Sequence, residues 1–196
     1  MTKLFLSLVS LFALAACQSP SQPSGDESNR PAEDSPAAET NKDSLVYEGE
    51  RYLKNIRQLT DGGDNAEAYF SFGGDKLVFQ SNFENWQLSC DQIFWFNWQE
   101  DNLMENRPPM NSKNRGRTTC SYFLPGDTTI IYATTHLQQD SCPPEPSRSE
   151  GYVWPIYPSY DIVVADLEGN TIDTLTNQPG YDAEPTVSPK GDKIVF

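Results

Sequence analysis

Short apolar segments alternate with glycine-containing turns between residues 57 and 196. Residues 77–79 and 194–196 are apolar triplets of β-branched, leucine and aromatic side chains, and each follows a Gly-Asp-Lys turn. A further short segment with strand character precedes each turn. Two short strands joined by a tight turn that needs a positive φ form a β-hairpin, so this pattern predicts an all-β fold.

The hairpins are copies of one another. The first runs from Asn65 to Phe79 and the last from Tyr181 to Phe196, with a weaker copy between them at residues 119–132. The matched pairs are Leu59-Thr60 with Leu175-Thr176, Ala66-Glu67 with Ala183-Glu184, Ser71 with Ser188, and Gly74-Asp75-Lys76 with Gly191-Asp192-Lys193. An isolated hairpin cannot bury its apolar face, so the repeats are expected to stack until their sheets share one core.

Segments between the hairpins supply further strands. In the second repeat these are residues 160–166 and 171–175, joined by a turn at 167–170. In the first repeat the third strand is expected at 92–98, and a poorly marked fourth near 103–106. The copies are 53 residues apart (Phe79 to Tyr132) and 64 residues apart (Tyr132 to Phe196), which places insertions at 82–91 and 136–159.

The order Leu-Thr, Ala-Glu-Pro, Ser-Pro-Lys-Gly-Asp-Lys and an apolar triplet resembles the WD-like β-propeller repeat of the TolB type. The resemblance covers residues 45–196 and implies four-stranded antiparallel blades, of which about two and a half are present. Phe72 departs from the pattern, because it stands where the Ser-Pro proline belongs. Propellers close with about four to eight blades, so the sequence is expected to continue beyond Phe196. The alternative is an ordinary β-sandwich whose strands share Gly-Asp turns.

Residues 1–16 have the composition of a signal peptide. A short basic start precedes thirteen apolar or small residues, too few to span a bilayer as a helix, and Leu14-Ala15-Ala16-Cys17 is similar to the lipobox of bacterial lipoproteins. That resemblance implies acyl chains on Cys17; the alternative is a plain secretory signal with an incidental cysteine. Residues 17–44 are acidic and rich in Pro and Ser, which predicts a disordered tether that reaches about 30 Å on average.

Charge narrows the range of partners. The chain has a formal net charge of −14, and removal of the signal peptide takes away only Lys3, which leaves −15. An acidic chain with no Lys/Arg cluster is a poor ligand for nucleic acid or an anionic membrane surface. Membrane attachment is therefore expected through the acyl chains on Cys17. Gln18 follows that cysteine, which by resemblance to enterobacterial lipoproteins favours the outer membrane, facing the periplasm, over the inner membrane or the cell surface.

Three cysteines follow Cys17, and an exported protein favours a disulfide. Cys90 and Cys142 fall in the loops between the second and third strands of their repeats, and Cys120 opens the first strand of the second repeat. All three are expected at one end of the sheets, and the pair Cys120–Cys142 is preferred because it encloses the shorter loop. Free thiols, or a zinc site completed by His136, are the alternatives; without paired C-x-x-C spacing, no metal or other cofactor is predicted.

Aromatic side chains gather in two places. Residues 94–98 have strand character with two apolar faces, which predicts packing between sheets. The second group lies in the Pro-rich insertion and consists of Tyr152, Trp154, Tyr157 and Tyr160. The favoured interpretation is a loop folded over the sheet edge, and the alternative is an exposed surface for a partner or a sugar.

One histidine and no G-x-S-x-G segment give little basis for nucleophilic catalysis, so the chain is not expected to be an enzyme. The resemblance implies a non-catalytic propeller that binds envelope proteins or peptides, with a role alongside envelope transport systems. Similar repeats precede the hydrolase domain of prolyl-oligopeptidase-like serine peptidases, so a gating propeller with a catalytic domain beyond Phe196 is the first alternative. A glycan-binding propeller is the second.

Overall fold

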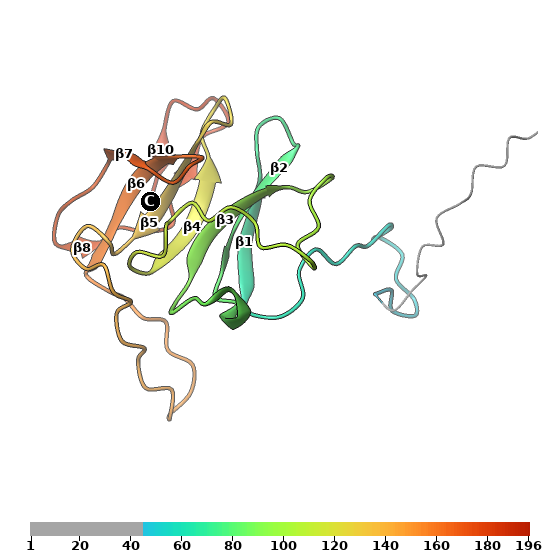
Figure 1. Cartoon of the computed structure of the whole chain (residues 1–196), viewed down its shortest axis with the longest axis horizontal. Helices are drawn as coiled ribbons and strands as arrows, with labels where there is room; N and C mark the ends of the chain where they lie inside the picture. The colour runs from blue at the N-terminus through green and yellow to red at the C-terminus, as the bar shows by residue number, and fades with distance from the viewer. Residues whose placement is uncertain (1–44) are drawn as a thin grey trace, which may run out of the picture. The chain divides into compact units, whose positions relative to one another are not determined.

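The alternating apolar segments form antiparallel strands in the computed structural model, which describes residues 45–196. These residues belong to a unit that begins at Ser44 (Figure 1). The predicted signal peptide, the lipid attachment at Cys17 and the tether lie outside the described residues. Within 45–196 there is no α-helix, and no helix long and apolar enough to cross a bilayer. The prediction of an all-β fold is therefore confirmed for this part of the chain.

The first sheet contains strands β1 (Asn65–Phe70), β2 (Lys76–Ser81) and β3 (Gln92–Asn97) in that order. A short helical turn, η1 (Glu84–Trp86), lies between β2 and β3.

The prediction of a fourth strand in the first repeat, near residues 103–106, is wrong. Asn102 begins a turn there, with its carbonyl accepting the Asn106 N–H at 3.0 Å and its side chain accepting the Met104 N–H. The edge of β3 is instead covered further along the chain, where Met110 pairs with Phe94 in an isolated bridge. An Asx turn satisfies its own backbone locally, so residues 103–106 have no need of a sheet partner.

The second sheet has the strand order β4-β5-β6-β7, as the repeat predicted. Its bounds are β4 (Thr118–Phe123), β5 (Thr129–Thr134), β6 (Ser159–Asp166) and β7 (Thr171–Thr174). The short strand β8 (Gly180–Tyr181) pairs in parallel with the start of β6. Strands β9 (Thr186–Val187) and β10 (Ile194–Val195) then form the hairpin of the last copy. The loop between β5 and β6 projects from the same end of the sheets as η1 (Figure 1).

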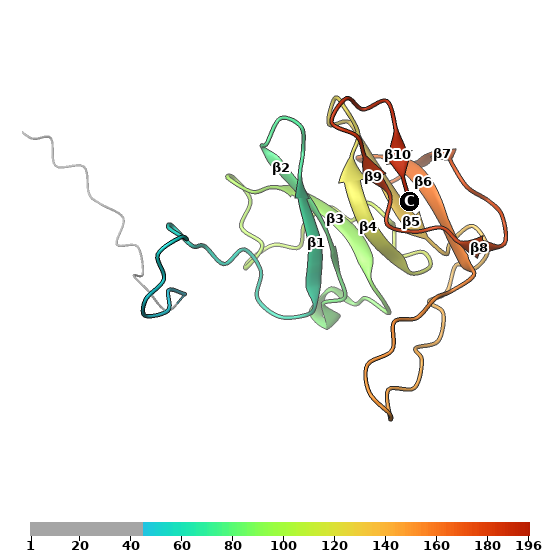
Figure 2. The ribbon, with the colours of Figure 1, turned by 180° about the vertical axis from the view of Figure 1, so that it is seen from behind.

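Successive residues of a strand point to opposite faces of its sheet. Because consecutive residues of the central strands are apolar, both faces of each sheet carry apolar side chains. Val78 and Ile93 of the first sheet pack with Phe123 and Ile130 of the second. The opposite face of the second sheet packs Ile131, Ile162 and Val164 against Val187 of β9. The first sheet, the second sheet and the last hairpin therefore stack on one another in chain order (Figure 2). On the outer face of the first sheet, Phe79, Phe94 and Phe96 are buried beneath Leu59 and Leu103.

The three hairpin turns have the same backbone design. Ser71, Leu124 and Ser188 each donate their N–H to the carbonyl five residues later, at 2.9–3.0 Å. The residue at the tight position has a positive φ in every copy: 74° at Gly74, 56° at Asp127 and 70° at Gly191. The middle copy, which is the weakest in sequence, therefore keeps the geometry of the other two.

Candidate functional site

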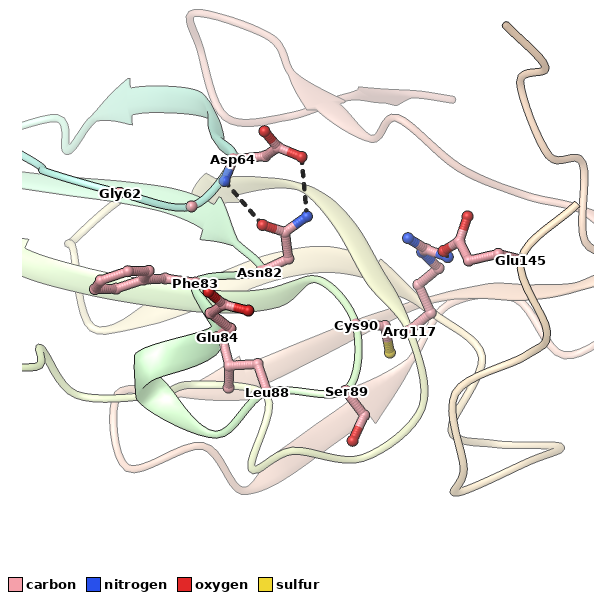
Figure 3. Close-up of a pocket in the computed structure, with 11 residues that line it drawn as sticks. Gly62, Asp64, Asn82, Phe83, Glu84, Leu88, Ser89, Cys90, Arg117 and Glu145 are labelled. Atoms are coloured by element: carbon pink, nitrogen blue, oxygen red, sulfur yellow. Dashed lines mark hydrogen bonds and ion pairs between the residues drawn. The ribbon is translucent and has the colours of Figure 1, made fainter. Parts of the chain in front are cut away.

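Two adjoining hollows lie at the end of the sheets that carries η1 and the β5–β6 loop. The larger is an open depression of about 570 Å³ (Figure 3). The smaller, here called the face groove, has a volume of about 230 Å³. Asp64, Asn82 and Arg117 line both hollows, so the two form one continuous feature.

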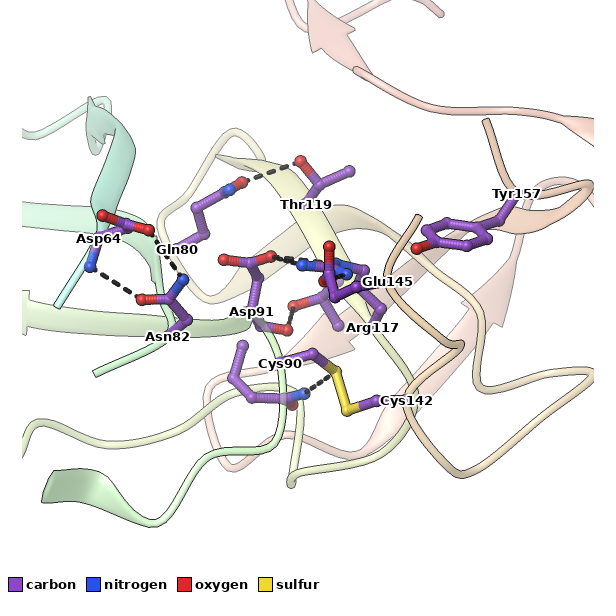
Figure 4. A network of polar contacts seen from close by, with 12 residues as sticks. Asp64, Gln80, Asn82, Cys90, Asp91, Arg117, Thr119, Cys142, Glu145 and Tyr157 are labelled. Atoms are coloured by element: carbon purple, nitrogen blue, oxygen red, sulfur yellow. Dashed lines mark hydrogen bonds and ion pairs between the residues drawn. A yellow bond between two sulfur atoms is a disulfide. The ribbon is translucent and has the colours of Figure 1, made fainter. Parts of the chain in front are cut away.

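Polar side chains of the first repeat line one part of the face groove. The Asp64 N–H donates to Asn82 Oδ1 at 2.8 Å, and Asn82 Nδ2 donates to Asp64 Oδ2 at 3.2 Å (Figure 3). Gln80 Oε1 accepts from Thr119 Oγ1 at 2.9 Å and from the Cys120 N–H at 3.0 Å (Figure 4). The Gln80 bonds join the first sheet to the second, so this lining is held in place by both repeats.

Arg117 anchors the centre of the site, with only 11% of its side chain exposed. Its Nη2 and Nε lie 2.7 and 3.1 Å from Asp91 Oδ2, and its Nη1 donates to the Glu145 carboxylate. Burial alone would lower the pKa of Arg117, but the hydrogen bonds and charges of Glu145 and Asp91 outweigh it and raise the pKa. The guanidinium is already neutralised by two carboxylates, so its role here is to position groups rather than to bind an anion.

The disulfide joins Cys90 to Cys142, with their Cα atoms 6.0 Å apart (Figure 4). Cys120 is a buried free thiol. The preferred pairing of Cys120 with Cys142 is therefore wrong. Cys120 lies at a bulge in β4, where φ is +48° and the pairing with β5 shifts register. The bulge places Cys120 at a different cavity from the loops that carry the other two cysteines.

The aromatic insertion is divided between core and surface. Tyr160 is buried with Ala133 and Ala183, and Tyr157 packs against that cluster and donates its hydroxyl to the Pro144 carbonyl at 2.9 Å. Tyr152 and Trp154 are 74% and 53% exposed and line the face groove. The later part of the loop, with Tyr157 and Tyr160, is thus folded over the sheet edge. The earlier part, with Tyr152 and Trp154, is an exposed surface.

The exposed part of the loop is fastened at its base. Cys142 is bonded to Cys90 of the first repeat, and Glu145 binds Arg117. Further along, Trp154 Nε1 lies 3.3 Å from the Tyr181 hydroxyl. The two exposed aromatic rings are therefore carried by a segment with fixed attachments on both sides.

His136 lies at the end of β5, away from the face groove lining, and is buried. Its Nδ1 is 2.9 Å from Thr134 Oγ1, and burial, aided by the charge of Arg115, lowers the pKa of the imidazole. The zinc site considered for this histidine would need the thiolates of Cys90 and Cys142, which are joined to each other. Among residues 45–196 no three metal-ligating side chains are grouped to hold an ion.

A third cavity, here called the bulge cavity, has a volume of about 180 Å³ and involves residues whose role the sequence did not reveal. It is lined by Glu67, Cys120 and Glu184, and by Tyr69, Tyr122 and Trp154. Burial, with smaller contributions from the charges of Glu67 and Glu184, raises the pKa of Cys120 to about 11. Glu67 and Glu184 occupy equivalent positions in the first and last copies of the repeat. This match was the one indication in the sequence that the two residues could lie close together.

No protein-family model matches the chain, and no curated protein matches it.

Proposed function

We propose that residues 45–196 form TolB-like β-propeller repeats that bind a protein or peptide at the face groove and have no catalytic role of their own. Support for the propeller comes from repeated antiparallel sheets that stack through both faces, with one hairpin turn design in all three copies.

The observation that carries the binding role is the pair of exposed aromatic rings, Tyr152 and Trp154, on a loop fastened beside a polar groove. Tyr and Trp are the side chains most enriched where binding energy concentrates. A loop held by a disulfide and an ion pair loses little conformational entropy when a ligand binds, which favours affinity.

The alternatives have less support. The hydroxyl beside His136 is that of Thr134, and both side chains are buried away from the face groove, so a peptidase activity would need a different catalytic group. A glycan site on the loop at residues 152–160 would also need hydrogen-bonding groups in the face groove, but the Asp64 and Asn82 side chains there already bond to each other. Protein or peptide binding therefore fits the groove better than either.

The proposed setting is the cell envelope, with acyl chains on Cys17 in the outer membrane and the propeller on the periplasmic side. Residues 17–44 would supply a reach of about 30 Å between lipid and propeller. Mass spectrometry of the amino-terminal peptide tests this directly. The expected result is a lipid-modified Cys17 as the first residue, and an unmodified Cys17 or cleavage elsewhere would contradict it.

The binding role is tested by photo-crosslinking in intact cells, with p-benzoyl-phenylalanine placed at Tyr152 or Trp154. Ile172 is the matched control, because it is 57% exposed on β7 and lies outside the face groove. A protein adduct is expected at both groove positions and not at Ile172. Adducts of equal yield at all three positions, or none at the groove, would reject the proposal.

A further inference from the structure

The bulge cavity is built by one backbone irregularity that recurs in all three repeats. Glu67, Cys120 and Glu184 are equivalent residues, and each has a positive φ, of 52°, 48° and 58°. None is glycine, and such a conformation is uncommon for residues of these types. In β1 and β4 the bulge also shifts the pairing with the next strand. The recurrence brings the three side chains to one cavity instead of leaving them along separate strands.

The cavity has a negative character that nothing in residues 45–196 compensates. No lysine or arginine lines it, and neither Glu67 nor Glu184 forms an ion pair with a described residue. Both carboxylates act on the Cys120 thiol between them, in the direction that disfavours a further negative charge. The Glu67 carboxylate accepts a hydrogen bond from Tyr69 at 2.5 Å and retains acceptor capacity beyond it.

Two further features indicate an occupant. Ser121 also lines the cavity, is fully buried, and its Oγ has no hydrogen-bond partner within the described residues. A buried polar atom without a partner is costly, and a ligand would satisfy it. Tyr69 and Tyr122 add aromatic walls, with ring centroids 4.6 Å apart. Aromatic faces together with carboxylates are the surroundings that an organic cation prefers.

We propose that the bulge cavity receives the side chain of an arginine or lysine from a peptide whose backbone lies in the face groove. The proposal deepens the proposed function and rests on it. Trp154 lines both the face groove and the bulge cavity, so a chain in the groove is adjacent to the cavity entrance. A volume of about 180 Å³ is below that of a site for a drug-sized ligand and suits one side chain.

The experiment is isothermal titration calorimetry of the full chain at low salt with the peptide acetyl-Ala-Ala-Arg-Ala-Ala-amide. The control peptide replaces arginine with citrulline, which keeps the shape and removes the charge. Binding of the arginine peptide is expected to be about tenfold tighter or more, as for a charge-assisted contact. Glu67→Gln and Glu184→Gln should each weaken it about tenfold, whereas Glu184→Asp should retain part of the affinity. Glu168→Gln, at an exposed site outside the cavity, should leave it unchanged.

Equal affinity for the arginine and citrulline peptides would overturn the proposal, as would unchanged binding in both glutamine variants. Spermidine is the third ligand, and if it binds as tightly as the peptide, the occupant is a free polyamine and the peptide assignment is wrong. Thermal unfolding of each variant shows whether a lost affinity reflects a lost fold.

The crosslinking and calorimetry results together separate this inference from the proposed function. If the Trp154 crosslink forms but the arginine and citrulline peptides bind equally, the face groove binds protein and only the cavity inference fails. If charge discrimination persists without any crosslink, the cavity binds a cationic side chain and the proposed protein-binding role fails.

Discussion

The Asp127 carboxylate accepts the backbone N–H of Gly73, which belongs to the hairpin turn of the preceding repeat, at 2.7 Å. It also accepts the Phe72 N–H at 2.7 Å. Asp127 occupies the position held by glycine in the other two copies, where φ is positive. The residue that departs from the repeat is therefore the one that connects neighbouring turns.

Substitution at Asp127 should separate the backbone effect from the hydrogen bonds. Asp127→Gly keeps the positive φ but loses both bonds, and should lower the free energy of unfolding by about 1 kcal/mol. Asp127→Ala loses the bonds and adds strain at positive φ, so it should cost about 1 kcal/mol more. Urea unfolding measures both, with the exposed Thr128→Ala as control. Equal stability of the glycine variant and the natural protein would show that the bonds between turns contribute nothing.

Loss of the disulfide should destabilise the fold and release the β5–β6 loop. The bond between Cys90 and Cys142 spans 52 residues, for which chain entropy gives about 4 kcal/mol. The double variant Cys90→Ser/Cys142→Ser is expected to show that loss in urea unfolding. Non-reducing peptide mapping of the natural protein should recover this pair, with Cys120 alkylated slowly in the folded protein at neutral pH and readily after unfolding. A recovered Cys120–Cys142 peptide, or three accessible thiols, would contradict the structure.

Removal of the buried cation should leave Asp91 without an ion-pair partner and Glu145 with only the longer contact to Arg148. Arg117→Ala is expected to lower the free energy of unfolding by about 3 kcal/mol, because Asp91 and Glu145 stay close together. Arg115→Ala is the matched control, since its ion pair with Asp140 is largely exposed and should contribute below about 1 kcal/mol. If both variants lose the same free energy of unfolding, the buried ion pairs of Arg117 contribute no more to stability than the exposed pair of Arg115.

Reaction of Cys120 with iodoacetamide should be slow at neutral pH and rise only at alkaline pH, because its pKa is raised to about 11. Glu67→Gln should lower this pKa and speed the reaction; Glu168→Gln should not. The folded state favours the neutral thiol, so its contribution to stability is complete below pH 9 and declines as the pH rises toward about 11. Peptide mapping after timed labelling gives the rate at Cys120 alone. A thiol that titrates near its ordinary pKa would contradict the burial of Cys120.

Local features were predictable from the sequence, and long-range pairings were not. The glycine-containing turns and apolar triplets located β2, β5 and β10 because a hairpin is defined by residues close together in the chain. The failed prediction at residues 103–106 followed the expected strand count, which a bridge at Met110 satisfies instead.

The site depended on relationships that no local pattern encodes. Arg117 meets Asp91 and Glu145 from two other loops, and only the fold brings them together. Cys120 was misassigned because a bulge at a residue other than glycine leaves no mark in the sequence. The exposed aromatic residues were identifiable by composition, but their attachment beside the groove was not.

The disulfide has a consequence for when the groove can form. Cys90 belongs to the first repeat and Cys142 to the second, so one covalent bond sets the spacing across the seam between adjacent repeats. The disulfide therefore restricts sliding of the two sheets against each other next to the face groove. Before the cysteines are oxidised, the same seam depends on non-covalent contacts: apolar packing, the ion pair of Arg117 with Asp91, and hydrogen bonds such as those of Gln80. If the face groove binds as proposed, oxidation of the two cysteines would fix its geometry and so favour binding by the exported, oxidised protein.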